Sequence, residues 1–166
     1  PGSDGKDVVI GISPAFGLKL FQTTAGHRLS DVLSAMSEAI ARRGLKPRIV
    51  RFLHTADTSF LGLSAARLAG SGIGIGIQAK GTAVIHQRDR LPHNNLELFS
   101  NAPITRLEHY RGLGANAAAY ALREMPPQGV KLPPNVSVLF APISCCVLHP
   151  NNNPSCWRRQ GRDQEL

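Results

Sequence analysis

A glycine-rich segment is the first part of this sequence whose residue spacing could serve binding chemistry. Residues 70–81 read Gly-Ser-Gly-Ile-Gly-Ile-Gly-Ile-Gln-Ala-Lys-Gly. Successive side chains of a strand point to opposite faces, so Gly72, Gly74 and Gly76 share one face and three isoleucines share the other. A strand face without side chains favours close approach by either a flat ligand or a tightly packed helix. Because the glycines lie within the strand and not before a helix, they do not fit a dinucleotide fingerprint.

Two charged residues lie just beyond predicted strands. Lys80 follows the glycine-rich strand, and Asp57 follows a predicted strand at residues 46–53 and begins a predicted helix. Open α/β sheets bind ligands outside the carboxyl ends of their strands, so both residues are candidates for ligand binding. Asp57 has an alternative role as an acid at a helix N-terminus, which stabilises a helix by about 0.3–1 kcal/mol.

The residue types that usually perform catalysis form no constellation in this sequence. The six histidines include no His-x-x-x-His or His-Glu-x-x-His pair, and Cys145, Cys146 and Cys156 lack zinc-site spacing. Nothing in the sequence marks an activated serine nucleophile. We therefore expect neither a catalytic residue nor a metal site in this chain. Three cysteines confined to the last part of the chain favour a reducing compartment.

The hydrophobic pattern predicts the elements that position Asp57 and Lys80. Strands are predicted at residues 8–13, 46–53, 73–78 and 82–87, and helices at 30–43 with Ser30 as N-cap, 58–69 and 105–125. Strands that alternate with helices are typical of βαβ units on a parallel sheet. The predicted fold is therefore α/β, a Rossmann-like three-layer domain with a mainly parallel sheet.

Composition and charge limit the classes of function. The 166 residues are 42% hydrophobic and 18% charged, which is typical of a globular chain. No apolar stretch is long enough to span a membrane. Nineteen Lys and Arg against eleven Asp and Glu give a net charge of +8, but the basic residues are scattered and aromatic residues make up only 5%. Nucleic-acid binding is therefore disfavoured. We expect a linker or tag remnant at residues 1–6, one domain at 7–126 and an atypical tail at 127–166.

Ordered motifs run through most of the chain. They are Val-Ile-Gly-Ile-Ser-Pro-Ala-Phe-Gly at residues 9–17, the segment 70–82, Val-Ile-His-Gln at 84–87, Asn-Leu-Glu-Leu-Phe at 95–99 and Ala-Pro at 102–103. In this order they resemble the medium subunit of adenosylcobalamin-dependent diol/glycerol dehydratase. The resemblance extends over about residues 7–123.

The resemblance implies a role within a larger enzyme. In that family the medium subunit is Rossmann-like and forms one wall of a base-on cobalamin site. A large barrel subunit carries the radical dehydration of 1,2-diols such as propanediol and glycerol to aldehydes, and a small helical subunit completes the complex. The resemblance thus implies adenosylcobalamin as a cofactor shared with the large subunit, and a location in the cytoplasm or in the lumen of a bacterial microcompartment.

The resemblance and the glycine pattern together give the candidate cofactor-binding residues. They are Asp57, Lys80, Gly72, Gly74, Gly76, Asn101, Ala102 and Pro103. Cobalamin-binding proteins that replace the cofactor's base with a histidine carry Asp-x-His-x-x-Gly. Here His109 and Gly112 match that motif, but Leu107 stands in place of the aspartate. We therefore expect base-on binding.

Two further features leave alternatives open. Residues 131–166 do not match the family, which is consistent with a replaced or frame-shifted C-terminus and removes an arginine that the family places near the cofactor's phosphate. The small subunit of the dehydratase-reactivating factor, a chaperone for cofactor exchange, has a similar fold and is the alternative function. The motifs at 70–82 and 95–99 favour the enzyme subunit over this chaperone. A free-standing basic RNA-binding domain is a third hypothesis.

Overall fold

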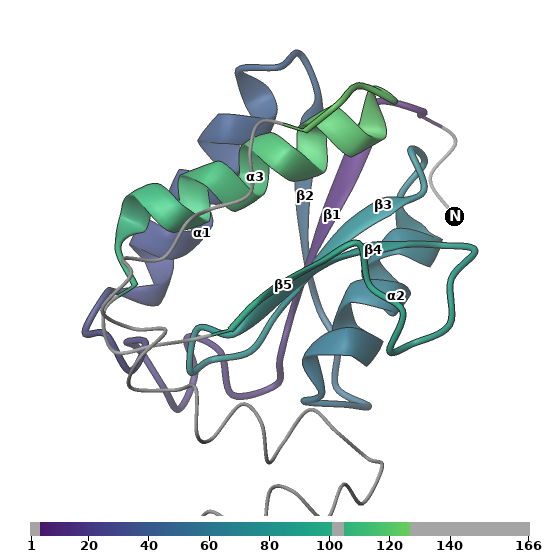
Figure 1. The fold of residues 1–166 in the computed structure, drawn as a ribbon. Helices are drawn as coiled ribbons and strands as arrows, with labels where there is room; N and C mark the ends of the chain where they lie inside the picture. The colour runs from purple at the N-terminus through teal and green to yellow at the C-terminus, as the bar shows by residue number, and fades with distance from the viewer. Residues whose placement is uncertain (1–3, 101–104, 127–166) are drawn as a thin grey trace, which may run out of the picture. The chain divides into compact units, whose positions relative to one another are not determined.

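A five-stranded sheet with helices on both faces forms the framework of the chain (Figure 1). The structure is a computed structural model that describes residues 4–100 and 105–126. Its elements are β1 (Asp7–Ile12), α1 (Leu29–Ala41), β2 (Lys46–Arg51), α2 (Thr58–Leu68), β3 (Ile73–Ile77), β4 (Ala83–Gln87), β5 (Glu97–Phe99) and α3 (Leu107–Ala121). Two predictions fall outside the described residues. They are the cofactor-binding role of Asn101, Ala102 and Pro103, and the atypical tail at 127–166.

The sheet is mixed, which differs from the mainly parallel sheet that was predicted. Its strand order is β2-β1-β3-β4-β5, with β1 parallel to both β2 and β3. β4 runs antiparallel to β3, and β5 runs antiparallel to β4. Only residues 78–82 join β3 to β4, whereas a parallel connection needs a crossover of a dozen or more residues. The α/β class is confirmed, and the Rossmann-like topology stays a prediction.

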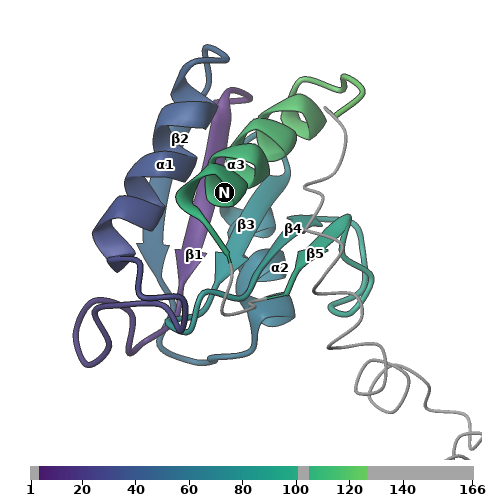
Figure 2. The ribbon, with the colours of Figure 1, turned by 60° about the vertical axis from the view of Figure 1, so that its left-hand side comes forward.

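Helices cover both faces of the sheet and produce the expected three layers. Figures 1 and 2 show α1 and α3 side by side on one face and α2 on the other. All six residues of β1 are buried, as expected for a central strand that is covered on both faces. α3 lies very close to α1, since a Cβ at Gly114 would come within 2.6 Å of the Met36 carbonyl oxygen.

The helix ends differ in detail from the prediction. The N-cap of α1 is Arg28 and not Ser30, whose hydroxyl donates a hydrogen bond to Asp31 within the helix. Gly44 follows α1 with a φ of +74°, a left-handed conformation that favours glycine and ends the helix. α3 is shorter than predicted and ends at Ala121. No helix in the described part of the chain has both the length and the apolar character that a membrane span requires.

Candidate functional site

The carboxyl edge of the parallel strands gathers the residues that the sequence singled out. The loops after β1, β2 and β3 emerge at this edge, and α1 and α2 begin there (Figure 2). The start of α3 joins them, because the His27 ring contacts the Thr105 carbonyl oxygen at 2.5 Å. Asp57 and Lys80 both lie at this edge and are exposed. The structure thus brings together two of the predicted binding residues.

Asp57 is the N-cap of α2. Its Oδ1 accepts hydrogen bonds from the backbone N–H groups of Ser59, at 2.9 Å, and Phe60, at 3.1 Å. The alternative that the sequence left open, a helix N-terminal acid, is therefore part of its role. Among the described residues, no hydrogen bond involves Oδ2 of this exposed carboxylate. Asp57 can cap the helix through one oxygen and accept a hydrogen bond from a ligand through the other.

Lys80 lies in the tight turn between β3 and β4. The Gly81 N–H donates to the Gln78 carbonyl at 2.9 Å, and the Gln78 N–H donates to the Thr82 carbonyl at 3.0 Å. The Thr24 N–H donates to the Lys80 carbonyl at 3.1 Å, which ties the turn to the loop after β1. Within residues 4–100 and 105–126, the Lys80 ammonium group forms no ion pair with an acid. Hydrogen bonds therefore hold the backbone at Lys80, and its ammonium group remains available to a ligand.

The loop after β1, which contacts the Lys80 turn through Thr24, carries exposed apolar side chains. Leu18 and Phe21, in the loop after β1, are each 63% exposed, and Leu20 is 44% exposed. The backbone that leads into these residues is fixed by Arg51. One guanidinium nitrogen of Arg51 donates to the carbonyls of Ser13, Pro14 and Phe16, at 3.1, 2.9 and 2.7 Å. Large apolar side chains on a fixed backbone form a surface that is suited to an apolar partner or ligand.

The glycine face of β3 does not form part of this surface. A Cβ built on Gly74 or Gly76 would lie less than 3.0 Å from backbone atoms of α2, including those of Ala65 and Gly62. The helix therefore occupies the bare face, and the prediction that this face backs a ligand is wrong. The other alternative, a tightly packed helix, is what the structure shows. Glycine at these positions lets α2 approach the sheet closely enough to exclude any ligand.

Gly72 lies at the other end of β3 from Lys80. It precedes the strand with a φ of +80° and packs under the Arg88 guanidinium group. It also lines a polar hollow of about 550 Å³ with Arg88, Tyr120 and Arg123. This hollow is at the amino edge of the parallel strands, so Gly72 cannot contact a ligand that is bound at Lys80.

The described histidines have structural contacts. His86 is fully buried, with Nδ1 2.8 Å from the Gln87 carbonyl oxygen and Nε2 about 3 Å from two carbonyl oxygens of the following loop. His109, which matched part of a cobalamin motif, accepts a hydrogen bond from the Arg106 N–H through Nδ1 and caps α3. In the described residues, no three His, Cys, Asp or Glu side chains form a group that could hold a metal ion.

Several residues that build this edge were not identified from the sequence. Gln78 donates a side-chain hydrogen bond to the Thr58 hydroxyl at 2.8 Å, which links the Lys80 turn to the start of α2. Tyr110 donates its hydroxyl hydrogen bond to the Gly81 carbonyl at 3.0 Å. Burial raises the pKa of the Tyr110 hydroxyl above its ordinary value of 10.0, so the group is a neutral donor near pH 7. No local sequence pattern predicts such contacts, because the partners lie 20 and 29 residues apart in the sequence.

A comparison with protein families gives a match over most of the chain. The family model described as dehydratase medium subunit matches residues 13–127. The chain belongs to the dehydratase medium subunit family. A medium subunit is one part of a multi-subunit dehydratase, so the chain is a component of a hydro-lyase complex.

Two similar solved structures are described as dehydratase-reactivating proteins. A glycerol dehydratase reactivase is 17% identical with a TM-score of 0.59, and the match covers 72% of this chain and 95% of that one. A diol dehydratase-reactivating factor complexed with ADP and Mg²⁺ is 14% identical with a TM-score of 0.57, and that match covers 74% and 97%. At these identities the likeness shows a shared fold and nothing more.

Proposed function

We propose that this chain is the medium subunit of a coenzyme-B12-dependent propanediol/glycerol dehydratase. In this role it forms one side of a base-on adenosylcobalamin site that a large subunit completes. The observation that carries the proposal is the carboxyl edge, where Asp57 and Lys80 are exposed and where the loop after β1 carries exposed apolar side chains. The family membership supports the same assignment.

The side chains at this edge fit the chemistry of the cofactor. A corrin is broad and nearly flat, and its rim carries amide groups, so it needs an apolar wall with a few donors and acceptors. Leu18, Leu20 and Phe21 supply exposed apolar area. The Asp57 carboxylate can accept from amide N–H groups, and the Lys80 ammonium can donate to amide carbonyls. Hydrogen bonds to charged groups contribute about 1.5–3 kcal/mol each, so two such contacts make a measurable part of the affinity.

In this proposal the chain binds and orients the cofactor, and the reacting groups belong to the large subunit. When bound, adenosylcobalamin supplies the radical that the dehydration of a 1,2-diol requires. The part played here by Lys80 and Asp57 is to hold the rim in one orientation against the large subunit. The apolar loop excludes water from the side that it covers. We assign no catalytic residue and no metal ligand to this chain.

The same proposal names partners and a location. The partners are the large and small dehydratase subunits, together with a reactivating factor that exchanges the cofactor. The complex would reside in the cytoplasm or in the lumen of a bacterial microcompartment. Asn101, Ala102 and Pro103 remain proposed cofactor contacts. The proposal of a frame-shifted tail at 127–166 is tested by comparing the coding DNA in all three frames.

Coexpression tests the proposed function. The full chain is produced with a large and a small dehydratase subunit, and aldehyde formation from propane-1,2-diol and glycerol is measured with and without adenosylcobalamin. Copurification with the large subunit and cofactor-dependent aldehyde formation are expected. Omission of this chain is the control and should abolish both. Copurification with an ATPase, and not with the large subunit, would instead support a reactivating factor, whose fold the solved structures share.

A further inference from the structure

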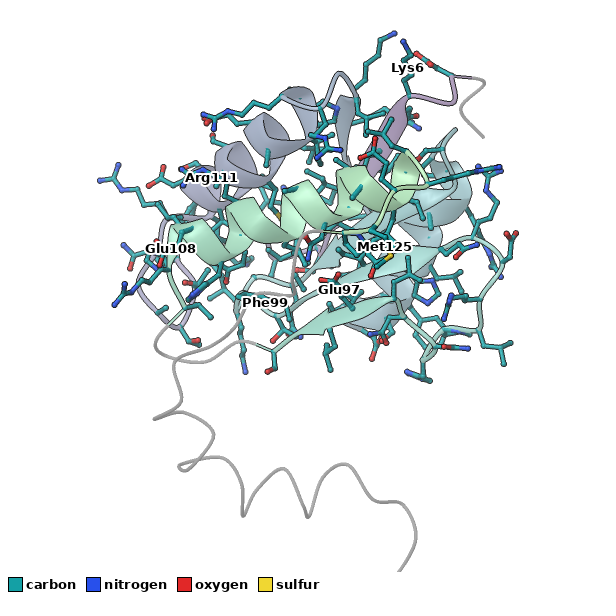
Figure 3. The ribbon with its side chains drawn as sticks, turned by 45° about the horizontal axis from the view of Figure 1, so that its top comes forward. Lys6, Glu97, Phe99, Glu108, Arg111 and Met125 are labelled. Carbon is teal, nitrogen blue, oxygen red and sulfur yellow. The ribbon has the colours of Figure 1, made fainter. Side chains whose placement is uncertain are left out.

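The Tyr110 hydroxyl is a buried polar group that neither the sequence nor the proposed function has assigned. Tyr110 lies in the first turn of α3 and is fully buried. Its ring packs edge-on against Phe99 of β5, with ring centroids 5.2 Å apart, so the tyrosine has one fixed position. Figure 3 shows Phe99 on the strand below α3. The hydroxyl donates to the Gly81 carbonyl, the residue after Lys80.

The backbone around Lys80 is closely fitted to this hydroxyl. Gly81 has a φ of +107°, and a Cβ there would come within 2.5 Å of the Tyr110 hydroxyl oxygen and 3.1 Å of Thr23. A glycine is required both by the backbone conformation and by the close approach of the tyrosine. The Thr24 N–H, from the loop after β1, donates to the Lys80 carbonyl. The two peptide groups that follow Lys80 are therefore held by hydrogen bonds from two separate segments of the chain.

The same turn is linked to the helix that Asp57 caps. Gln78, three residues before Gly81, donates its side-chain hydrogen bond to Thr58, the first residue of α2. Tyr110 on α3, the turn, and the start of α2 therefore form one continuous chain of contacts. This chain fixes the position of the Lys80 backbone relative to the Asp57 carboxylate.

We propose that Tyr110 is a positioning residue whose hydroxyl, through the Gly81 carbonyl, sets where the Lys80 ammonium meets the cofactor. The inference rests on the proposed function, because Lys80 matters only if this edge binds a ligand. A lysine side chain is long and flexible, so a loose turn would spread its charge over a large volume and lower the affinity. Tyr110 itself is buried beneath the turn and acts through it.

Tyr110→Phe tests this role, with Tyr120→Phe as the matched control. Phenylalanine keeps the ring and its packing and removes only the hydroxyl. The Tyr120 hydroxyl donates to Glu97 at 3.0 Å, away from the Lys80 turn. The first readout is amide hydrogen exchange in residues 78–82 of the full chain without partners. Tyr110→Phe and Gly81→Ala should accelerate exchange in this turn, while Tyr120→Phe should leave it unchanged.

The second readout is the dissociation constant of adenosylcobalamin for the complex reassembled with large and small subunits. The loss of one neutral hydrogen bond predicts a roughly three- to ten-fold weaker affinity for Tyr110→Phe. Lys80→Met should also weaken binding, and adding Tyr110→Phe to it should cause no further loss, because the hydroxyl acts through the lysine.

The outcomes separate this inference from the proposed function. If Lys80→Met weakens binding but Tyr110→Phe does not, the positioning role is overturned and the proposed function stands. The positioning role is also overturned if Tyr110→Phe weakens binding equally in the unaltered chain and in the Lys80→Met variant. Unchanged amide hydrogen exchange in residues 78–82 overturns it as well. If Lys80→Met leaves the affinity unchanged, the assignment of this edge fails and the positioning role fails with it.

Discussion

Gly74→Ala tests directly whether the glycine face of β3 is a packing surface. The added Cβ would lie 2.6 Å from the Ala65 carbonyl carbon, and closer still to the Ala66 nitrogen. Carbon atoms in optimal contact are about 3.5–4.0 Å apart, so α2 would have to move away from the sheet by roughly 1 Å. The atoms that block the methyl group belong to helix backbone, which cannot rotate away as a side chain can.

The cost follows from that displacement. Overpacking of a dense core costs about 1–3 kcal/mol, and rigid backbone neighbours place this site near the upper end. Alanine also restricts the unfolded chain, which offsets about 0.4–1 kcal/mol. The expected net loss is therefore about 2 kcal/mol in the free energy of unfolding. This is a large fraction of the ~5–15 kcal/mol that stabilises an ordinary domain.

Urea unfolding of the full chain without partners or cofactor measures this loss. With a slope of about 1–3 kcal/mol per molar, the midpoint should fall by about 1 M. Gly5→Ala is the matched control, because a Cβ at Gly5 would meet nothing within 4 Å. Its effect should stay within about 0.5 kcal/mol. If Gly74→Ala unfolds like Gly5→Ala yet weakens cobalamin binding in the complex, the packing explanation is refuted.

Substitutions at three further residues test the rest of the framework. Arg51→Met removes the donor to three loop carbonyls and should lower the free energy of unfolding by about 2 kcal/mol. Amide hydrogen exchange in the loop after β1 should become faster. Unchanged exchange would contradict the role of the guanidinium group. Asp57→Ala should lower the free energy of unfolding by about 1 kcal/mol, because the α2 cap is lost. Asp57→Asn should keep the cap and most of that free energy. Equal losses for the two variants would argue against capping. Glu97→Gln should lower the pKa of Tyr120, which burial and then the nearby Glu97 charge raise above 10.0. An ultraviolet titration follows this change. Because the unfolded chain loses the tyrosine proton first, the stabilisation from both raised tyrosines, Tyr110 and Tyr120, should be lost as pH rises beyond about 10, and stability that does not fall there would contradict these shifts.

Local patterns in the sequence predicted most of the elements of this fold. The β-branched run of β1 and the helical spacing of α1 each depend on neighbours within a few residues. The direction of β4 was not anticipated, although the short segment at residues 78–82 already excludes a parallel return. Ser30 was expected to cap α1, but the N-cap is Arg28, two residues earlier, and the helix begins at Leu29. Helix ends vary by a residue or two because several neighbouring residues can satisfy the first N–H groups.

The candidate site was predicted only in part, and for physical reasons. The positions of Lys80 and Asp57 after their strands were enough to place both at one edge. The glycine face of β3 was ambiguous, because a face without side chains accommodates a helix as well as a ligand. The structure resolves this ambiguity through the contacts of α2 with Gly74 and Gly76. The contact between Tyr110 and Gly81 depends on how α3 packs over β5, which no local pattern encodes.

The affinity of the assembled complex for adenosylcobalamin tests the central claim most directly. Lys80→Met is compared with Lys6→Met, an exposed lysine at the opposite end of the sheet; Figure 3 shows Lys6 far from Glu108 at the start of α3. Loss of a hydrogen bond from a charged donor should weaken binding roughly ten- to a hundred-fold for Lys80→Met. Lys6→Met should bind like the unaltered chain. Equal affinities for the two variants would contradict the assignment of the carboxyl edge as a cofactor site.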